Sequence, residues 1–583
     1  MDKLTALRTL MKERNIDAYI IPSGDDHNSE YVADYWKSRT WISGFTGSAG
    51  LAVVTHNEAY LWTDGRYFIQ AENELDKFSL QKIGALGVPT YQEYLKEKLP
   101  TNGTVGFDGR ALSVADFGAL KTLLGDITYS YNEDLVGLIW DNRPPLPTAP
   151  AFVHLPEFAG FSVAEKLELV RKKMVETKVE TYLVTALDDV AWLLNIRGSD
   201  TGSTPLVYAY VVITSNDAWL FINPEKIAGI EGHLEDFIVM PYDAIPEVLS
   251  AVPAADSRIY YNASKTSMLL TDSIPDGVAV ATETQDIIAY MKSEKTDHEL
   301  ANMRNAYVKE GVVIVRLLKW LDDSLAAGKT LTEADVVDKL ASLRTEQKHA
   351  IGESFAAIAA YGANAALPHY HHSGRGCEIK PEGLFLLDCG GQYLDGTTDT
   401  TRTIAVGEIT PEIKRNFTLV LKGHIALTLA VFPKGTTGQP LDIISRMPLM
   451  QECLDFNHGT GHGIGYCLSV HEGPQSISKA STVALVPGMV LSNEPGFYKE
   501  GEYGIRIENA IAVKEIGKNE FGEFLGFETL TYCPYDLSAV DAEILTQIEK
   551  DFINKYHRRV VDTLCPLLDE DETVWLKNRT RAI

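Results

Sequence analysis

Residues 386–403 read LLDCGGQYLDGTTDTTRT, and four related segments follow: HGTGHGIG (458–465), VHEGP (470–474), LSNEPG (491–496) and GIRIENAI (504–511). Four carboxylates lie inside or at the ends of their apolar runs: Asp388, Asp399, Glu494 and Glu508. A buried ion without compensation costs several kcal/mol, even after the protein relaxes around it. We therefore expect cations beside these residues, and a pair of divalent metals would supply them.

The glycine-rich segment 458–465 carries two histidines, His458 and His462, four residues apart. On a helix this spacing would suggest a zinc site of the H-E-x-x-H kind. Four glycines in eight residues argue against a helix, because each costs about 1 kcal/mol relative to alanine. Glycine instead lets the backbone approach a ligand closely. We expect a turn in which an imidazole joins the carboxylates, and His471 is a further candidate.

The surrounding pattern places these groups on strands. Asp388 ends a strand at a glycine turn and Asp399 lies on the return strand, so we expect the two side chains to be close across an antiparallel pair. Arg506 and Glu508 are two residues apart and face one side of a strand. Oxygen-rich ligation favours Mn, Co or Zn in a dinuclear site over a structural cysteine-bound zinc. Such a pair of metals implies hydrolysis by a bridging hydroxide.

Composition narrows the functional class. The 583 residues leave room for three domains, and the net charge of −27 argues against nucleic acids and anionic membrane surfaces as partners. We find no run of about 20 apolar residues that could span a bilayer and expect no signal peptide. The six cysteines are scattered singly, which is typical of a reducing compartment such as the cytoplasm.

An internal repeat organises the first half. YIIPSGDD (19–26) and YLVTALDD (182–189) match at the same offsets and continue into similar strands, so we expect two α/β domains of one fold. The proline-rich segment 141–150 separates them as a stiff linker. We predict domains at 1–145, 151–290 and 291–536, with a C-terminal extension at 537–583 that contains an amphipathic helix from Ala539 to Val561.

These motifs, in this order, resemble those of the pita-bread metallopeptidases. Together with FTGSAG (45–50), ALDDVAWLLNIRGSD (186–200) and the His369-Tyr370 pair, the set is similar to the aminopeptidase P (Xaa-Pro aminopeptidase) family in its long three-domain form. The resemblance covers essentially the whole chain. It implies an α/β (α+β) protein with two duplicated creatinase-like N-terminal domains before a pita-bread catalytic domain.

The resemblance also implies five metal ligands. Asp388 would bind one metal, Asp399 and Glu508 would bridge both, and His462 and Glu494 would bind the second. The expected cofactor is a pair of divalent ions, Mn²⁺ in the first place and Co²⁺ or Zn²⁺ as alternatives. A hydroxide that bridges the metals would attack the scissile carbonyl, and Glu494 would carry the proton to the leaving nitrogen.

Four further residues receive roles from the same resemblance. His369 and His471 would hydrogen-bond the scissile region and stabilise the tetrahedral intermediate. His458 would line the pocket for the penultimate proline, and Arg506 would orient Asp388. The expected substrates are peptides with an N-terminal Xaa-Pro sequence, and the resemblance suggests a homodimer.

Three alternatives share the fold. Prolidase cleaves Xaa-Pro dipeptides, but the tandem N-terminal domains and VHEGP argue against it. Creatinase works without metals, whereas all five ligand positions are intact here. A non-catalytic pita-bread scaffold that binds proteins would have lost ligands, and none is lost.

Overall fold

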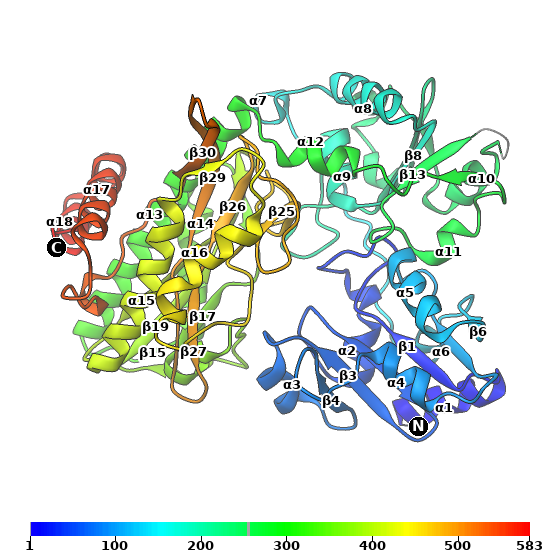
Figure 1. Ribbon diagram of the computed structural model, residues 1–583, viewed down its shortest axis with the longest axis horizontal. Coiled ribbons are helices and arrows are strands. Elements are labelled where there is room, and N and C mark those ends of the chain that lie inside the picture. Colours follow the sequence, from blue (N-terminus) through cyan, green and yellow to red (C-terminus); the bar gives the residue numbers. More distant parts are fainter. Residues whose placement is uncertain (1, 254–256) are drawn as a thin grey trace. The chain divides into compact units, whose positions relative to one another are not determined.

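The computed structural model describes residues 2–253 and 257–583 of the chain (Figure 1). It forms two compact units. Residues up to Pro156 together with Phe161–Ile288 make the first, and Glu157–Gly160 with Ala289–Ile583 make the second. None of the helices in the described part of the chain combines the length and the apolar character that crossing a bilayer requires.

Two six-stranded sheets of identical topology build the first unit. Their orders are β4-β3-β2-β1-β5-β6 and β12-β11-β10-β8-β13-β14. In each sheet the central strand pairs antiparallel with the following strand and parallel with a later one, as β1 does with β2 and β5 and β8 does with β10 and β13. This correspondence confirms the internal repeat. The strands are β1 (Ala18–Ile21), β2 (Leu51–Thr55), β3 (Ala59–Thr63), β4 (Ser79–Lys82), β5 (Thr104–Phe107), β6 (Thr128–Ser130), β8 (Thr181–Val184), β10 (Ala209–Thr214), β11 (Ala218–Ile222), β12 (Ile238–Met240), β13 (Arg258–Tyr261) and β14 (Ala279–Val280).

Local sequence explains the central strands and the helix that leads into the second sheet. β1 and β8 are continuous runs of buried residues, which is expected where both faces of a sheet are covered. Helix α8 (Val163–Thr177) begins at a capping box in which Ser162 and Glu165 satisfy each other's backbone N–H groups. The α/β class expected from alternating strands and helices is confirmed.

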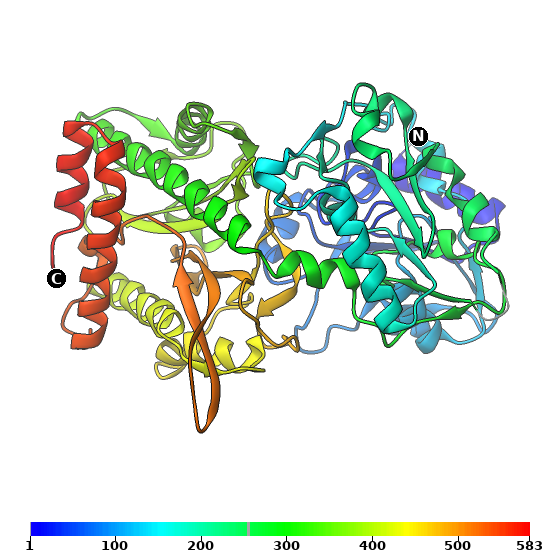
Figure 2. The ribbon, with the colours of Figure 1, turned by 90° about the horizontal axis from the view of Figure 1, so that it is seen from above.

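Antiparallel sheets and long helices build the second unit. Its larger sheet runs β23-β30-β29-β26-β24-β25, and a smaller one runs β17-β19-β22. Figure 2 shows α13 (Asp297–Ala326) as a long helix and β29–β30 as an extended hairpin. Three further helices of this unit are α14 (Glu333–Thr345), α15 (Pro411–Thr428) and α16 (Gly438–Met450). The strands are β17 (Ile358–Tyr361), β19 (Leu384–Cys389), β22 (Thr400–Ala405), β23 (Phe432–Pro433), β24 (Gly461–Gly463), β25 (Glu472–Ile477), β26 (Val490–Asn493), β29 (Asn509–Asn519) and β30 (Gly522–Thr529). A hairpin of β27 (Gly496–Lys499) and β28 (Tyr503–Arg506) joins β26 to β29.

The C-terminal segment differs from the helix expected between Ala539 and Val561. A short 3₁₀ turn ends at Ala539, and α17 (Gln547–Leu564) starts eight residues later at a Thr546–Glu549 capping box. The capping box fixes where the helix starts, because it satisfies N–H groups of the first turn. Apolar periodicity alone does not locate this position. A second helix, α18 (Glu570–Arg579), follows the Asp569 cap, and its acidic first turn suits the positive end of the helix dipole.

Candidate metal centre

Three strand ends bring Asp388, Asp399 and Glu508 together. Asp388 lies on β19 and pairs with Thr401 of β22. Glu508 lies between β28 and β29 and donates its N–H to the Thr401 carbonyl at 3.1 Å. Asp399 was expected inside the return strand but directly precedes β22. Its N–H donates to the Tyr307 hydroxyl at 3.2 Å instead of to a neighbouring strand, which accommodates a residue that strands disfavour.

His462 lies on β24 with its ring oriented by its own chain. Nδ1 is 2.9 Å from the Gly463 carbonyl, to which it donates, so Nε2 is the ring nitrogen that faces the carboxylates. Nε2 lies 3.4 Å from Asp399 Oδ2 and 3.5 Å from Glu494 Oε1. The segment that carries His462 is strand and turn, as its glycines require.

Two glycines of this segment are needed for close strand contact. A Cβ on Gly461 would lie 2.0 Å from the Ser492 carbonyl oxygen, and one on Gly463 would lie 2.3 Å from the Glu472 carbonyl oxygen. No side chain tolerates such distances. β24 can therefore fit between β25 and β26, and carry His462 to the carboxylates, only because these positions lack a side chain.

The crowded carboxylates perturb one another. Burial raises the pKa of Glu494 to about 7, although His462 and Arg506 oppose the shift. Burial also raises the pKa of Glu508, and the charges of Asp399, Glu494 and Asp388 add to the effect. Burial alone would lower the pKa of His462, but the hydrogen bond with Asp399 and the charges of Glu494 and Asp399 raise it to about 9. The protein without cations therefore binds protons that divalent ions would displace.

These residues fit divalent metal ions. Ligand atoms of Asp399, His462 and Glu508 all lie within 4.8 Å of one another. Asp388 Oδ1 and Glu508 Oε1 are buried and have no hydrogen-bond partner. Such unsatisfied oxygens are unfavourable unless something else binds them. Carboxylate oxygens and an imidazole nitrogen are ligands that suit Mn, Co and Zn.

A chain of hydrogen bonds runs from the carboxylates to His458. Arg506 donates from Nη2 to Asp388 Oδ2 at 2.6 Å and from Nη1 to the Tyr498 hydroxyl at 2.8 Å. The same hydroxyl lies 2.8 Å from His458 Nε2. Thr401 Oγ1 donates to Glu508 Oε2 at 2.7 Å. Sequence reasoning missed Thr401, which lies within the quoted segment 386–403, and Tyr498, which lies two residues beyond the quoted segment 491–496, because their partners are remote in sequence.

The two remaining histidines lie at different places. The His471 ring meets the His462 ring edge to face with centroids 4.3 Å apart, so it adjoins the cluster. His369 lies half-buried on the loop between β17 and β19. Its neighbour Tyr370 packs against Ile358 and Leu386, which belong to the strands around Asp388.

Protein families match the chain in four consecutive stretches. Residues 301–515 match metallopeptidase family M24, and residues 523–583 match the C-terminal region of peptidase M24. The creatinase/prolidase N-terminal domain matches twice, at residues 3–138 and 142–299. The double match agrees with the duplicated sheets.

Full-length relatives decide the family. A probable Xaa-Pro aminopeptidase P of Laccaria bicolor is 40% identical over 99% of this chain and 92% of its own. Aminopeptidase P2 of Arabidopsis thaliana is 39% identical over 100% of this chain and 88% of its own. The chain belongs to the aminopeptidase P family. It is thus a metallopeptidase, and the expected family is confirmed.

Solved structures of the family extend the likeness to the fold. The X-prolyl aminopeptidase of Caenorhabditis elegans, described as a cytosolic enzyme with a di-nuclear active site, has a TM-score of 0.95, 36% identity and 100% coverage of this chain and 99% of its own. The Xaa-Pro dipeptidase of Bacillus anthracis has a TM-score of 0.53 and 25% identity, and it covers 64% of this chain and 99% of its own. The M24 family and the ligand cluster together support two divalent metal ions.

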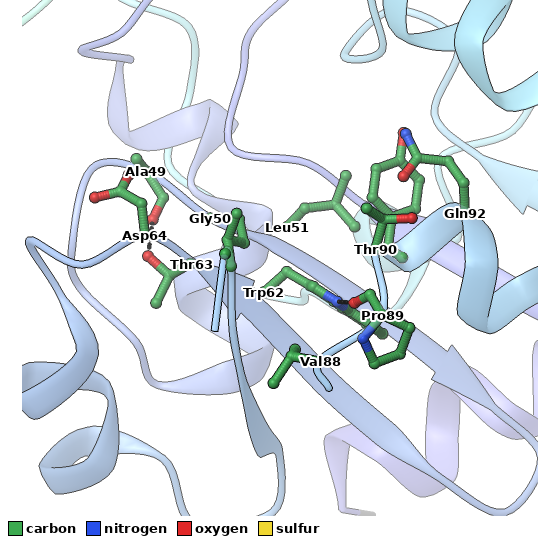
Figure 3. Close-up of a pocket in the computed structure, with 13 residues that line it drawn as sticks. Ala49, Gly50, Leu51, Trp62, Thr63, Asp64, Val88, Pro89, Thr90 and Gln92 are labelled. Atoms are coloured by element: carbon green, nitrogen blue, oxygen red, sulfur yellow. Dashed lines mark hydrogen bonds between the residues drawn. The ribbon is translucent and has the colours of Figure 1, made fainter. Parts of the chain in front are cut away.

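A separate cavity of about 360 Å³ opens in the first sheet domain of this aminopeptidase P family member (Figure 3). The ends of β2 and β3 line it together with residues 83–92, and the Trp62 indole N–H donates to the Pro89 carbonyl at 2.8 Å. None of its lining residues belongs to the metal centre.

Proposed function

We propose that the chain is a metal-dependent aminopeptidase that releases the N-terminal residue from peptides with proline in the second position. The convergence of buried, partly unsatisfied carboxylates with His462 carries this proposal. The full-length similarity to Xaa-Pro aminopeptidases P supports it.

We assign the five ligands as the family does: Asp388 to one metal, His462 and Glu494 to the other, and Asp399 and Glu508 to both. Mn²⁺ is the proposed ion, with Co²⁺ and Zn²⁺ as alternatives. When bound, two such ions neutralise the carboxylates, polarise a substrate carbonyl and lower the pKa of water toward about 7.

Glu494 is the proposed proton carrier. Hydrolysis of an Xaa-Pro bond places the water oxygen on the carbonyl carbon and must deliver a proton to the proline nitrogen, which carries no hydrogen of its own. Glu494 lies within the ligand cluster, 3.5 Å from His462 Nε2, and there its carboxylate would accept the water's proton and pass it to the proline nitrogen.

The supporting residues bind the substrate and orient one metal ligand. His369 and His471 donate to the scissile region, which stabilises the oxyanion that develops there. His458 borders the proline pocket, held by its 2.8 Å contact with the Tyr498 hydroxyl. Arg506 directs Asp388 through their 2.6 Å hydrogen bond.

The wider assignment is the one that the sequence predicts. We propose domains at 1–145, 151–290 and 291–536 with an extension at 537–583, a homodimer, and a cytoplasmic location. Sedimentation of the metal-loaded protein tests the dimer, and fluorescent tagging in cells tests the location.

Prolidase-type dipeptidase activity is the second candidate, and the smaller coverage of the dipeptidase structures disfavours it. The test is cleavage of an Xaa-Pro-Yaa tripeptide and an Xaa-Pro dipeptide by chelated enzyme to which Mn²⁺, Co²⁺ or Zn²⁺ is returned. We expect metal-dependent release of the first residue from the tripeptide. Failure with all three ions would refute the proposal, and dipeptide cleavage alone would establish the second candidate.

A further inference from the structure

A carboxylate outside the metal centre organises the loop that carries His369. Glu333 is the first residue of α14, and its side chain is completely buried. Oε1 accepts from the Tyr361 N–H at 2.8 Å and from Asn364 Nδ2 at 2.9 Å. Oε2 accepts from the Tyr370 hydroxyl at 2.7 Å and from the Cys377 N–H at 3.0 Å. All four donors are neutral groups, and all belong to residues 361–377.

The start of α14 holds the same loop through its backbone. The Glu333 N–H donates to the Cys377 carbonyl and the Ala334 N–H to the Arg375 carbonyl, each at 3.2 Å. A Cβ on Gly376 would lie 2.4 Å from Glu333 Oε2, so the loop comes as close as a residue without a side chain permits. The loop, which is largely irregular, is therefore built around one buried carboxylate.

The Glu333 carboxyl group helps to keep two of its partners protonated. Burial and the hydrogen bond to Glu333 raise the pKa of Tyr370, so its hydroxyl keeps the proton that it donates. Burial and the same carboxylate raise the pKa of the Cys377 thiol to about 12. Each oxygen of the Glu333 carboxyl group accepts two hydrogen bonds, which suits a group that holds a loop in one conformation.

Tyr370 connects this loop to the strand of Asp388. Its ring packs against Ile358, Ala360, Ala365 and Leu386. Ile358 pairs directly with Asp388, and Leu386 precedes Asp388 by two residues, so both share the face of the sheet that bears Asp388. His369 is the residue next to Tyr370, and its backbone is fixed wherever Tyr370 is fixed.

A second element confines the loop from the other side. A Cβ on Gly504 of β28 would lie 1.7 Å from the Ala365 carbonyl oxygen. Gly504 precedes Arg506, the partner of Asp388, by two residues. The segment before His369 thus lies between the strand that carries Asp388 and the strand that carries Arg506.

We propose that Glu333 is a positioning residue for the aminopeptidase reaction, acting through Tyr370 to hold His369 at the scissile bond. The inference rests on the proposed role of His369. Glu333 itself touches neither substrate nor metal ligands. A displacement of about 1 Å at a reacting group can cost about a hundredfold in rate, so a loop anchor of this kind affects turnover without taking part in the chemistry.

Tyr370→Phe is the decisive variant. It removes the hydrogen bond that Tyr370 donates to Glu333 and the one that it accepts from Asn364, and it leaves the ring packing and three other donors to Glu333. We expect kcat for an Xaa-Pro-Yaa peptide to fall by about tenfold to a hundredfold, with KM and bound metal per chain unchanged. In Glu333→Gln, kcat should fall further, since the amide NH₂ of glutamine cannot accept from the Tyr370 hydroxyl or the Cys377 N–H. If this variant does not fold, Tyr370→Phe alone decides the question.

Asp338→Asn is the matched control. Asp338 lies on the same helix and bonds Arg375 of the same loop at 3.0 Å, but on the solvent side. The activity of the Asp338→Asn variant should equal that of the wild type, because exposed ion pairs of this kind contribute little to stability. An equal loss in Asp338→Asn would overturn the proposal, and so would metal loss in Tyr370→Phe, since the effect would then lie in the metal centre.

The His369→Ala background separates positioning from the role of His369. There Tyr370→Phe should cause no further loss of kcat, whereas a full additional loss would overturn the positioning role while leaving His369's role intact. If His369→Ala alone retained wild-type turnover, the proposed role of His369 would fail and the inference with it. Tripeptide cleavage by the wild type tests the proposed function itself, and its result does not depend on any of these variants.

Discussion

Arg506 Nη2 donates to Asp388 Oδ2 at 2.6 Å, and the two residues are 118 positions apart in sequence. The arginine side chain is 3% exposed and the aspartate side chain 12%. One carboxylate oxygen is thereby occupied, while Oδ1 remains without a hydrogen-bond partner. The contact leaves Asp388 with one oxygen directed by the protein and one available to a metal.

Replacing Arg506 with lysine should weaken metal binding by about tenfold to a hundredfold. A lysine ammonium cannot reproduce the fixed guanidinium geometry that holds Asp388 and Tyr498 together. Calorimetric titration of Mn²⁺ into the metal-free variant measures the change. Arg304→Lys is the control, because Arg304 pairs with partly exposed Glu528. Wild-type affinity in Arg506→Lys would contradict the orienting role.

Asp399→Asn should abolish turnover and leave the fold intact. The substitution removes one of the charges that raise the pKa of Glu508, and it also removes the carboxylate that raises the pKa of His462. These effects oppose each other, so the metal-free variant should melt close to the wild-type temperature. We expect activity to fall by more than about a hundredfold, beyond the usual effect of residues that only support a ligand. Calorimetric melting and the tripeptide assay test both parts, and retained turnover would rule out Asp399 as a bridging ligand.

Of two nearby glycines, only one should be sensitive to an added methyl group. In Gly461→Ala the new Cβ would lie 2.0 Å from the Ser492 carbonyl, so β24 and His462 must shift, at a cost of about 1–3 kcal/mol. In Gly459→Ala the nearest atom, Ser478 Cβ, is 3.4 Å away. Metal content and urea unfolding should therefore change only in Gly461→Ala. Equal behaviour of the two variants would show that the close approach is unimportant.

Two buried histidines should make the protein sensitive to acid. Burial, reinforced by Arg402, lowers the pKa of His424 to about 3 and that of His557 to about 4. Below the ordinary pKa of about 6.5 the unfolded chain binds protons that the folded chain excludes, so stability falls as the pH falls. At pH 5 the loss is about 2 kcal/mol for each histidine.

Urea unfolding at pH 7 and pH 5 checks this expectation. Between pH 7 and pH 5, the free energy of unfolding of His424→Gln should fall by about 2 kcal/mol less than that of the wild type. The exposed His371→Gln substitution should leave the difference unchanged. An unaltered pH dependence in His424→Gln would show that this histidine does not carry the effect.

Much of the architecture could be predicted from local pattern. The repeat at residues 19–26 and 182–189 leads to two sheets of one topology, because strand order follows from the sequence of strands and connections within each copy. The start of α17 was misplaced, since the Thr546 cap determines it and apolar periodicity does not. Asp399 was placed inside a strand, whereas its hydrogen bond to Tyr307 from another element holds it just outside.

By itself, the sequence determined the family, the kinds of ligand and the need for compensating cations. These depend on residue type and on neighbours a few positions away, which a linear pattern retains. Only the tertiary structure decided which groups meet: Arg506 with Asp388, Tyr498 with His458, and Glu333 with the His369 loop. Hydrogen bonds and electrostatic interactions act over a few ångströms, and residues tens of positions apart come within that range only when strands and helices pack.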